Sequence, residues 1–89
     1  MYLTKGINEK IANDLNFSQF VLNSMKRFNK LDWGELCEED KALNDWALKH
    51  QQGRIVARYN HINEVDNIYI IGYYLNGGIQ IEILFCSEY

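Results

Sequence analysis

The acidic residues of this chain are the ones whose type and spacing could support acid–base catalysis or binding. Half of the 12 acidic residues lie between positions 32 and 45, where only Lys41 opposes them. Neighbouring carboxylates such as Glu38 and Glu39 could supply an acid and a base, as in glycoside hydrolysis, although a run of charge is more often the solvated face of a helix. The stretch therefore indicates an anionic surface more strongly than a catalytic site. The six acids are Asp32, Glu35, Glu38, Glu39, Asp40 and Asp45.

Thiols and imidazoles are too few and too scattered to indicate a metal centre or a covalent mechanism. The cysteines are Cys37 and Cys86, the histidines are His50 and His61, and none of them forms a close ligand pair such as CxxC or HxxxH. Cys37 and His50 could border one helix, but the carboxylates beside Cys37 disfavour the thiolate that a nucleophile needs. We therefore expect no enzyme, no catalytic residue, no metal and no cofactor.

The number of cysteines and the hydropathy along the chain indicate the cellular compartment of the protein. Two cysteines do not make the disulfide framework of a small secreted domain, and no signal peptide opens the sequence. No apolar run approaches the roughly 20 residues that a membrane-spanning helix needs. We expect a reduced, cytoplasmic protein that makes no contact with a membrane.

Charge is distributed unevenly along the chain, whose net charge is −3. Residues 1–31 carry five basic side chains against Glu9 and Asp14, whereas residues 32–45 carry the six acids against Lys41. The acidic total argues against broad nucleic-acid binding, which needs a basic surface to displace counterions. The basic side chains of the first third are Lys5, Lys10, Lys26, Arg27 and Lys30.

Apolar spacing predicts helices over residues 7–52. A short helical segment covers residues 7–13, and a clearer helix follows it with Asn16 or Ser18 as the N-cap. Gly34 then breaks the pattern, because glycine costs a helix interior about 1 kcal/mol relative to alanine. The helical stripe that we expect to be buried consists of Phe17, Phe20, Val21, Ser24, Met25 and Phe28.

A second helix is expected from about Glu38 to Gln51. Acidic residues in its first turn would lie near the positive end of its dipole, and Gly53 would end it. The apolar side of this helix is predicted to consist of Leu36, Leu43, Trp46, Ala47 and His50.

After Gly53 the repeat of apolar residues changes to every second position, which predicts strands at residues 54–61, 68–74 and 79–85. Asn76-Gly77-Gly78 is a strong hairpin signal, because tight hairpin turns need positive φ angles. We expect an α+β fold with a single domain over residues 1–89. In it the N-terminal helices pack on one face of a three-stranded antiparallel sheet, a β-meander over residues 54–86, in the order ααβββ. The opposite face would turn Arg58, Tyr69, Tyr73, Gln80 and Glu82 toward water.

Four blocks of the sequence resemble a known family. They are Gly6-Ile7-Asn8, Phe20-Val21, the stretch Asp32-Trp33-Gly34-Glu35-Leu36-Cys37-Glu38-Glu39-Asp40-Lys41 followed by Asn44-Asp45, and the end Leu84-Phe85-Cys86-Ser87-Glu88-Tyr89. The chain resembles very small proteins encoded on bacterial plasmids, phages and integrated conjugative elements. Members are often labelled plasmid-related proteins, or a modification subunit of a type I restriction enzyme. The resemblance implies a mobile-element setting and no mechanism.

The second of those family labels does not fit this chain physically. A methyltransferase needs a longer chain and a glycine-rich cofactor loop. The tail also departs from the family, which has a polar Thr-Glu-Ala-Asp-Arg-like turn and a proline where this chain has Ile70-Ile71-Gly72-Tyr73-Tyr74 and Cys86.

Three functions remain open at this point. The first is a non-enzymatic interaction protein that inhibits a host defence complex, such as a CRISPR effector or a restriction enzyme, by offering its acidic surface to a basic groove. Trp33 would be its aromatic anchor. The contact residues that we expect are Asp32, Trp33, Glu35, Glu38, Glu39 and Asp45.

The alternative is an accessory regulator of plasmid or phage biology that binds DNA weakly through the five basic residues of its N-terminal helices. A small enzyme is the third function and has the least support. A homodimer could form through an edge strand or through Tyr69, Ile71 and Tyr73 if they were exposed.

Overall fold

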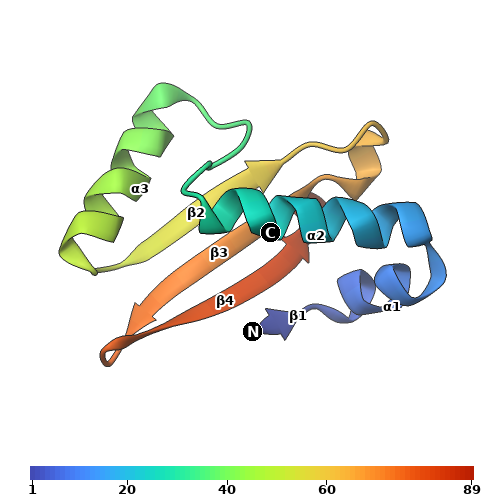
Figure 1. Ribbon diagram of the computed structural model, residues 1–89, viewed down its shortest axis with the longest axis horizontal. Helices are drawn as coiled ribbons and strands as arrows, with labels where there is room; N and C mark the ends of the chain where they lie inside the picture. The colour runs from blue at the N-terminus through green and yellow to red at the C-terminus, as the bar shows by residue number, and fades with distance from the viewer.

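The computed structural model describes residues 1–89 as an α+β fold with three helices and one sheet (Figure 1). The fold class predicted from the sequence is thus confirmed. Two short 3₁₀ turns, Glu64–Asp66 and Cys86–Glu88, complete the chain. The elements in order are β1 (Tyr2–Leu3), α1 (Lys5–Asn13), α2 (Leu15–Asn29), α3 (Glu38–His50), β2 (Arg54–Tyr59), β3 (Ile68–Leu75) and β4 (Gly78–Phe85).

The sheet has four strands in the order β1-β4-β3-β2, and not the three that the sequence predicted. Strands β2, β3 and β4 form the expected antiparallel meander. The additional strand is β1, which pairs in parallel with β4 at Glu82 and Ile83, and the Thr4 N–H donates to the Ile83 carbonyl at 3.2 Å. The prediction missed β1 because two residues carry no alternating pattern.

The predicted hairpin is confirmed at Asn76 and Gly77. Their φ angles are +45° and +84°, and Leu75 pairs with Gly78 across a two-residue turn. This register places Ala57, Ile70 and Ile83 side by side in the three antiparallel strands, and all three are buried. One face of the sheet is therefore the floor of the hydrophobic core.

Helices α1 and α2 cover that face, where α2 crosses the strands in Figure 1. The predicted stripe of α2 is confirmed, since Phe17, Val21, Ser24 and Phe28 are buried. The predicted N-cap is wrong. Asp14 caps α2 by accepting a hydrogen bond from the Phe17 N–H at 3.0 Å, because the short α1 ends directly before it.

Helix α3 departs from the predicted arrangement. It lies beside β2 at the edge of the sheet and not over the face that α1 and α2 cover (Figure 1). Its buried residues are Asn44 and Ala47, whereas Leu43 and Trp46 are 67% and 53% exposed and His50 is exposed as well. The predicted apolar side is therefore wrong for these three residues. Gln51, with φ of +51°, caps its end in place of Gly53.

The second face of the sheet is only partly open to solvent. Ile71 and Leu84 lie on it and are 1% and 7% exposed, so Ile71 offers no apolar surface for a homodimer. Tyr89 folds over this face and packs at a tilt against Tyr69, with 5.0 Å between the ring centroids. No helix combines the length and apolar composition that crossing a lipid bilayer requires.

Candidate functional site

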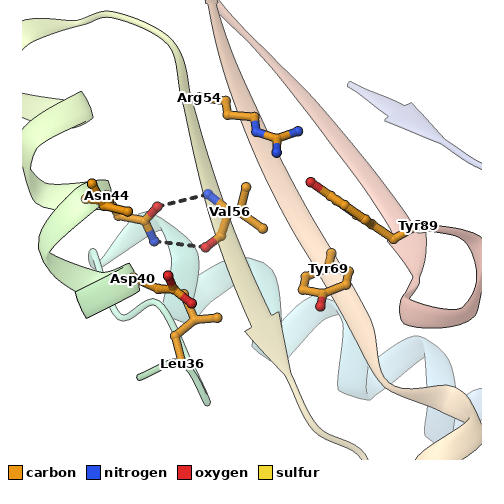
Figure 2. Close-up of a pocket in the computed structure, with 8 residues that line it drawn as sticks. Leu36, Asp40, Asn44, Arg54, Val56, Tyr69 and Tyr89 are labelled. Carbon is orange, nitrogen blue, oxygen red and sulfur yellow. Dashed lines mark hydrogen bonds between the residues drawn. The ribbon is translucent and has the colours of Figure 1, made fainter. Parts of the chain in front are cut away.

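The outer edge of β2 is closed by groups from outside the sheet. The Asn44 side-chain amide donates to the Val56 carbonyl at 2.8 Å and accepts from the Val56 N–H at 3.1 Å (Figure 2). Asn44 is 5% exposed and projects from the face of α3 that meets the strand. An amide can replace a neighbouring strand in this way because it carries one donor and one acceptor side by side.

The loop before α3 closes the same edge further along. The Glu35 N–H donates to the Arg58 carbonyl at 2.8 Å, and the Arg58 N–H donates to the Trp33 carbonyl at 3.2 Å. Gly34 lies between them with φ of +78°, and a Cβ atom there would lie 1.9 Å from the Arg58 carbonyl oxygen. Only glycine permits this approach of the loop to the strand.

Asp32 and Glu35 are held by internal partners. The Asp32 carboxylate accepts from Arg27 at 2.8 and 3.3 Å and from the Gly34 N–H at 3.0 Å. Glu35 accepts from Arg27 at 3.4 Å and from the Asn60 N–H at 3.1 Å. The hydrogen bond from Arg27, followed by that from the Gly34 N–H, lowers the pKa of Asp32. Both carboxylates therefore fasten the loop to α2 and β2.

Trp33 is not a surface anchor. It is 4% exposed and lies edge-on against Phe28, with ring centroids 5.6 Å apart. Its Nε1–H donates to the Asp45 carboxylate at 2.9 Å. The expectation that Trp33 lies on the surface is wrong, because the tight turn at Gly34 directs the indole inward, where Asp45 satisfies its polar atom.

The other expected contact residues, Glu38 and Glu39, do lie on the surface, in the first turn of α3. Glu38 makes a loose ion pair with Lys41 at 3.8 Å, and its side chain is 93% exposed. The exposed Leu43 and Trp46 follow on the same helix. We call Glu38, Glu39, Leu43 and Trp46 the outer face of α3.

A groove opens between α3 and the second face of the sheet, with a volume of about 340 Å³ (Figure 2). In Figure 2, Leu36 and Asp40 lie on one side of Val56, and Arg54, Tyr69 and Tyr89 lie on the other. The Arg54 guanidinium lies over the Tyr89 ring, 5.7 Å from its centroid. The lining residues are Leu36, Asp40, Leu43, Asn44, Arg54, Val56, Tyr69 and Tyr89, and we call this feature the α3 groove.

The basic residues of the first third are largely paired within the chain. Lys5 lies 3.9 Å from Glu9, Lys10 lies 3.4 Å from Asp66, and Arg27 is held by Asp32 and Glu35. Lys26 and Lys30 remain exposed without an ion pair. The fold thus leaves two of the five cations free at the end of α2.

Cysteine and histidine side chains do not meet. Cys37 is exposed, Cys86 is half-buried, and both thiols are free. Burial raises the pKa of Cys86, which disfavours its thiolate. His61 packs edge-on against Phe20, and His50 packs at a tilt against Trp46. No three His, Cys, Asp or Glu side chains gather in a way that could hold a metal ion.

Sequence reasoning missed most of the α3 groove. Asn44 could have been found as a polar residue three positions before the buried Ala47, on one side of the helix. Alternation did place Tyr69 on the second face of the sheet, but no local signal brought Arg54 and Tyr89 to it, because that depends on the pairing of β2 with β3 and on where Tyr89 folds back. In comparisons with known proteins, no family model matches this chain, and no curated protein or solved structure matches it either.

Proposed function

We propose that this chain is a non-enzymatic protein-interaction module that meets its partner through the outer face of α3. The observation that carries the proposal is the composition of this face. It has the exposed carboxylates of Glu38 and Glu39 at the start of α3 and the exposed apolar side chains of Leu43 and Trp46 further along the helix. Aromatic residues are enriched among the anchors of protein interfaces, and like charges around an anchor steer a partner of opposite charge.

The proposal is supported by a difference among the acidic residues, since some are bonded within the fold and others are not. Asp32, Glu35 and Asp45 have partners inside the chain, so they fix the loop and α3 and are not free for a partner. Glu38 and Glu39 hold no part of the fold together beyond the loose contact of Glu38 with Lys41. The expected contact surface therefore narrows from six residues to these two acids and the apolar residues beside them.

In the form that the family resemblance favours, the module is encoded on a mobile element and inhibits a host defence complex, a CRISPR effector or a restriction enzyme. A basic surface of that complex, which normally binds nucleic acid, would bind the acidic start of α3 instead of the nucleic acid. Such complexes act in the cytoplasm, so the proposal locates the protein there.

Weak DNA binding through the N-terminal helices has less support. Three of the five cations are paired with carboxylates, and only Lys26 and Lys30 are free. A gel shift at low salt separates the two functions, because DNA binding through lysines would appear there and weaken as salt rises.

The proposal is tested by affinity capture of the tagged chain from a host lysate, with and without nuclease, followed by mass spectrometry. A stoichiometric partner that survives nuclease treatment and carries a basic surface would support it. Recovery of nuclease-sensitive species alone, or of no partner, would contradict it.

A further inference from the structure

The α3 groove has two walls of different chemistry. Leu36, Asp40 and Leu43 line the side that belongs to α3 and the loop before it. Arg54, Tyr69 and Tyr89 line the side that belongs to the sheet, and Val56 lies between the two (Figure 2). The middle of the groove is therefore apolar and aromatic, and its charges stand on opposite walls.

Neither of those two charges belongs to an ion pair. Neither Asp40 nor Arg54 takes part in any of the ion pairs of the chain, although both line the same groove. They also lie more than 4.0 Å from each other, since no ion pair joins them at that limit. An occupant that brings a cation to Asp40 and an anion to Arg54 would satisfy both at once.

The aromatic wall is held in place. Tyr89 packs at a tilt against Tyr69, with 5.0 Å between the ring centroids. The guanidinium of Arg58 lies 5.9 Å from the centroid of the Tyr69 ring, and that of Arg54 lies 5.7 Å from the Tyr89 ring. The two adjacent rings thus have a guanidinium group at each end, and these contacts hold the side of the groove that would contact an apolar side chain.

We propose that the α3 groove binds a short segment of the protein partner that carries a basic side chain, an apolar side chain and an acidic side chain. The basic group meets Asp40, the acidic group meets Arg54, and the apolar side chain lies over Val56 against Tyr69. The volume of about 340 Å³ is near the lower end of ligand pockets, which run from roughly 300 to 1,000 Å³, and suits a few side chains and not a folded element. This inference rests on the proposed function, because it names what the partner presents.

The test is an NMR titration of the full-length ¹⁵N-labelled chain with capped peptides. Lys-Leu-Glu and Glu-Leu-Lys serve as probes, because the direction of the segment is open, and Gln-Leu-Gln is the uncharged control. We expect one of the charged probes to shift the amide signals of Asp40, Val56 and Tyr69, with an affinity at least tenfold above that of Gln-Leu-Gln.

Charge variants make the test specific. Asp40→Lys alone and Arg54→Glu alone should each abolish binding of the charged probe, because both walls then carry the same sign. The double variant, with the charges exchanged, should instead bind the other charged probe, which carries its two charges in the reversed order. Glu64→Gln removes an exposed acid that lines neither the groove nor the outer face of α3, and it should leave binding unchanged.

Equal binding of Gln-Leu-Gln, shifts confined to α1 and α2, or no shift with any probe would each overturn the groove proposal. The titration contains no partner protein. A negative titration would therefore contradict the groove proposal and not the proposed function, if a partner is captured from lysate. Failure to capture a partner would contradict the proposed function even if the groove binds the probe.

Discussion

The side-chain amide of Asn44 forms two hydrogen bonds with the backbone of Val56, one to the carbonyl oxygen at 2.8 Å and one from the N–H at 3.1 Å. Helix α3 is thereby hydrogen-bonded to the edge strand through one buried side chain. An edge strand left open presents unpaired backbone groups to other chains. The same contact positions the outer face of α3 and one wall of the α3 groove.

Asn44→Ala should destabilise the fold by about 2 kcal/mol, because it leaves the donor and acceptor of Val56 without partners in a partly buried position. Asn44→Asp should cost more, since a carboxylate faces the Val56 carbonyl and cannot donate to it. Urea unfolding followed by circular dichroism measures both. Asn29→Ala, at an exposed position, is the matched control and should stay within about 0.5 kcal/mol of the parent chain. Equal midpoints for Asn44→Ala and Asn29→Ala would contradict the role of Asn44.

Gly34→Ala and Gly53→Ala separate steric clash from backbone strain. Both glycines have positive φ, +78° and +75°, but a Cβ at position 34 would meet the Arg58 carbonyl, whereas one at position 53 meets nothing within 4 Å. We expect Gly53→Ala to cost about 1 kcal/mol, the price of a left-handed conformation. Gly34→Ala should cost at least about 3 kcal/mol, because the loop must also leave β2. Similar losses of thermal stability for the two variants would show that the loop does not approach Arg58 this closely.

Asp32 should make stability fall as the solution is acidified. Its folded pKa lies below the ordinary value of 3.8, first because of Arg27 and then because of the Gly34 N–H. A depressed folded pKa contributes stability that is present above about pH 4 and is lost as the pH falls through the lower, folded value.

Asp32→Asn should therefore flatten the loss of unfolding free energy below pH 4, as measured by urea titrations at a series of pH values. Arg27→Gln should flatten it less, because the Gly34 N–H remains. Some slope should persist in both variants, since the N-cap hydrogen bond from Phe17 also lowers the pKa of Asp14. An unchanged slope in Asp32→Asn would refute this account of the loop.

The two tryptophans should respond in opposite ways. Trp33→Phe loses the hydrogen bond to Asp45 and part of a buried ring, and should cost about 1–3 kcal/mol. Trp46→Phe should stay within about 0.5 kcal/mol, because that side chain is exposed. In the single-tryptophan variants, iodide should quench Trp46 readily and Trp33 weakly. Strong quenching of Trp33 would show that its indole is exposed and would contradict this account.

Periodic segments of the sequence predicted the elements well. The stripe of α2 from Phe17 to Phe28, the alternation of β2 and the turn at Asn76 and Gly77 each depend on residues close together in the chain. The strand β1 could not be predicted, because its two residues owe their conformation to pairing with Glu82 and Ile83.

The candidate site was less predictable because its acids look alike in sequence. Asp32 and Glu39 are both acidic residues on an exposed stretch, yet Arg27 holds the first and no ion pair holds the second. The inward turn of Trp33 and the outward position of Trp46 depend on Gly34 and on which side of α3 meets β2. These are long-range relationships that local spacing does not encode.

The most direct test of the central claim compares two charge variants in the same affinity capture. Glu38→Lys/Glu39→Lys changes the outer face of α3, and Glu9→Lys/Glu64→Lys makes the same change in net charge on α1 and in the turn before β3. The account predicts that the nuclease-resistant partner is lost with the first variant and retained with the second, while both keep the circular dichroism spectrum of the parent chain. Retention of the partner by the α3 variant would show that the acidic start of α3 serves only to keep the surface charged.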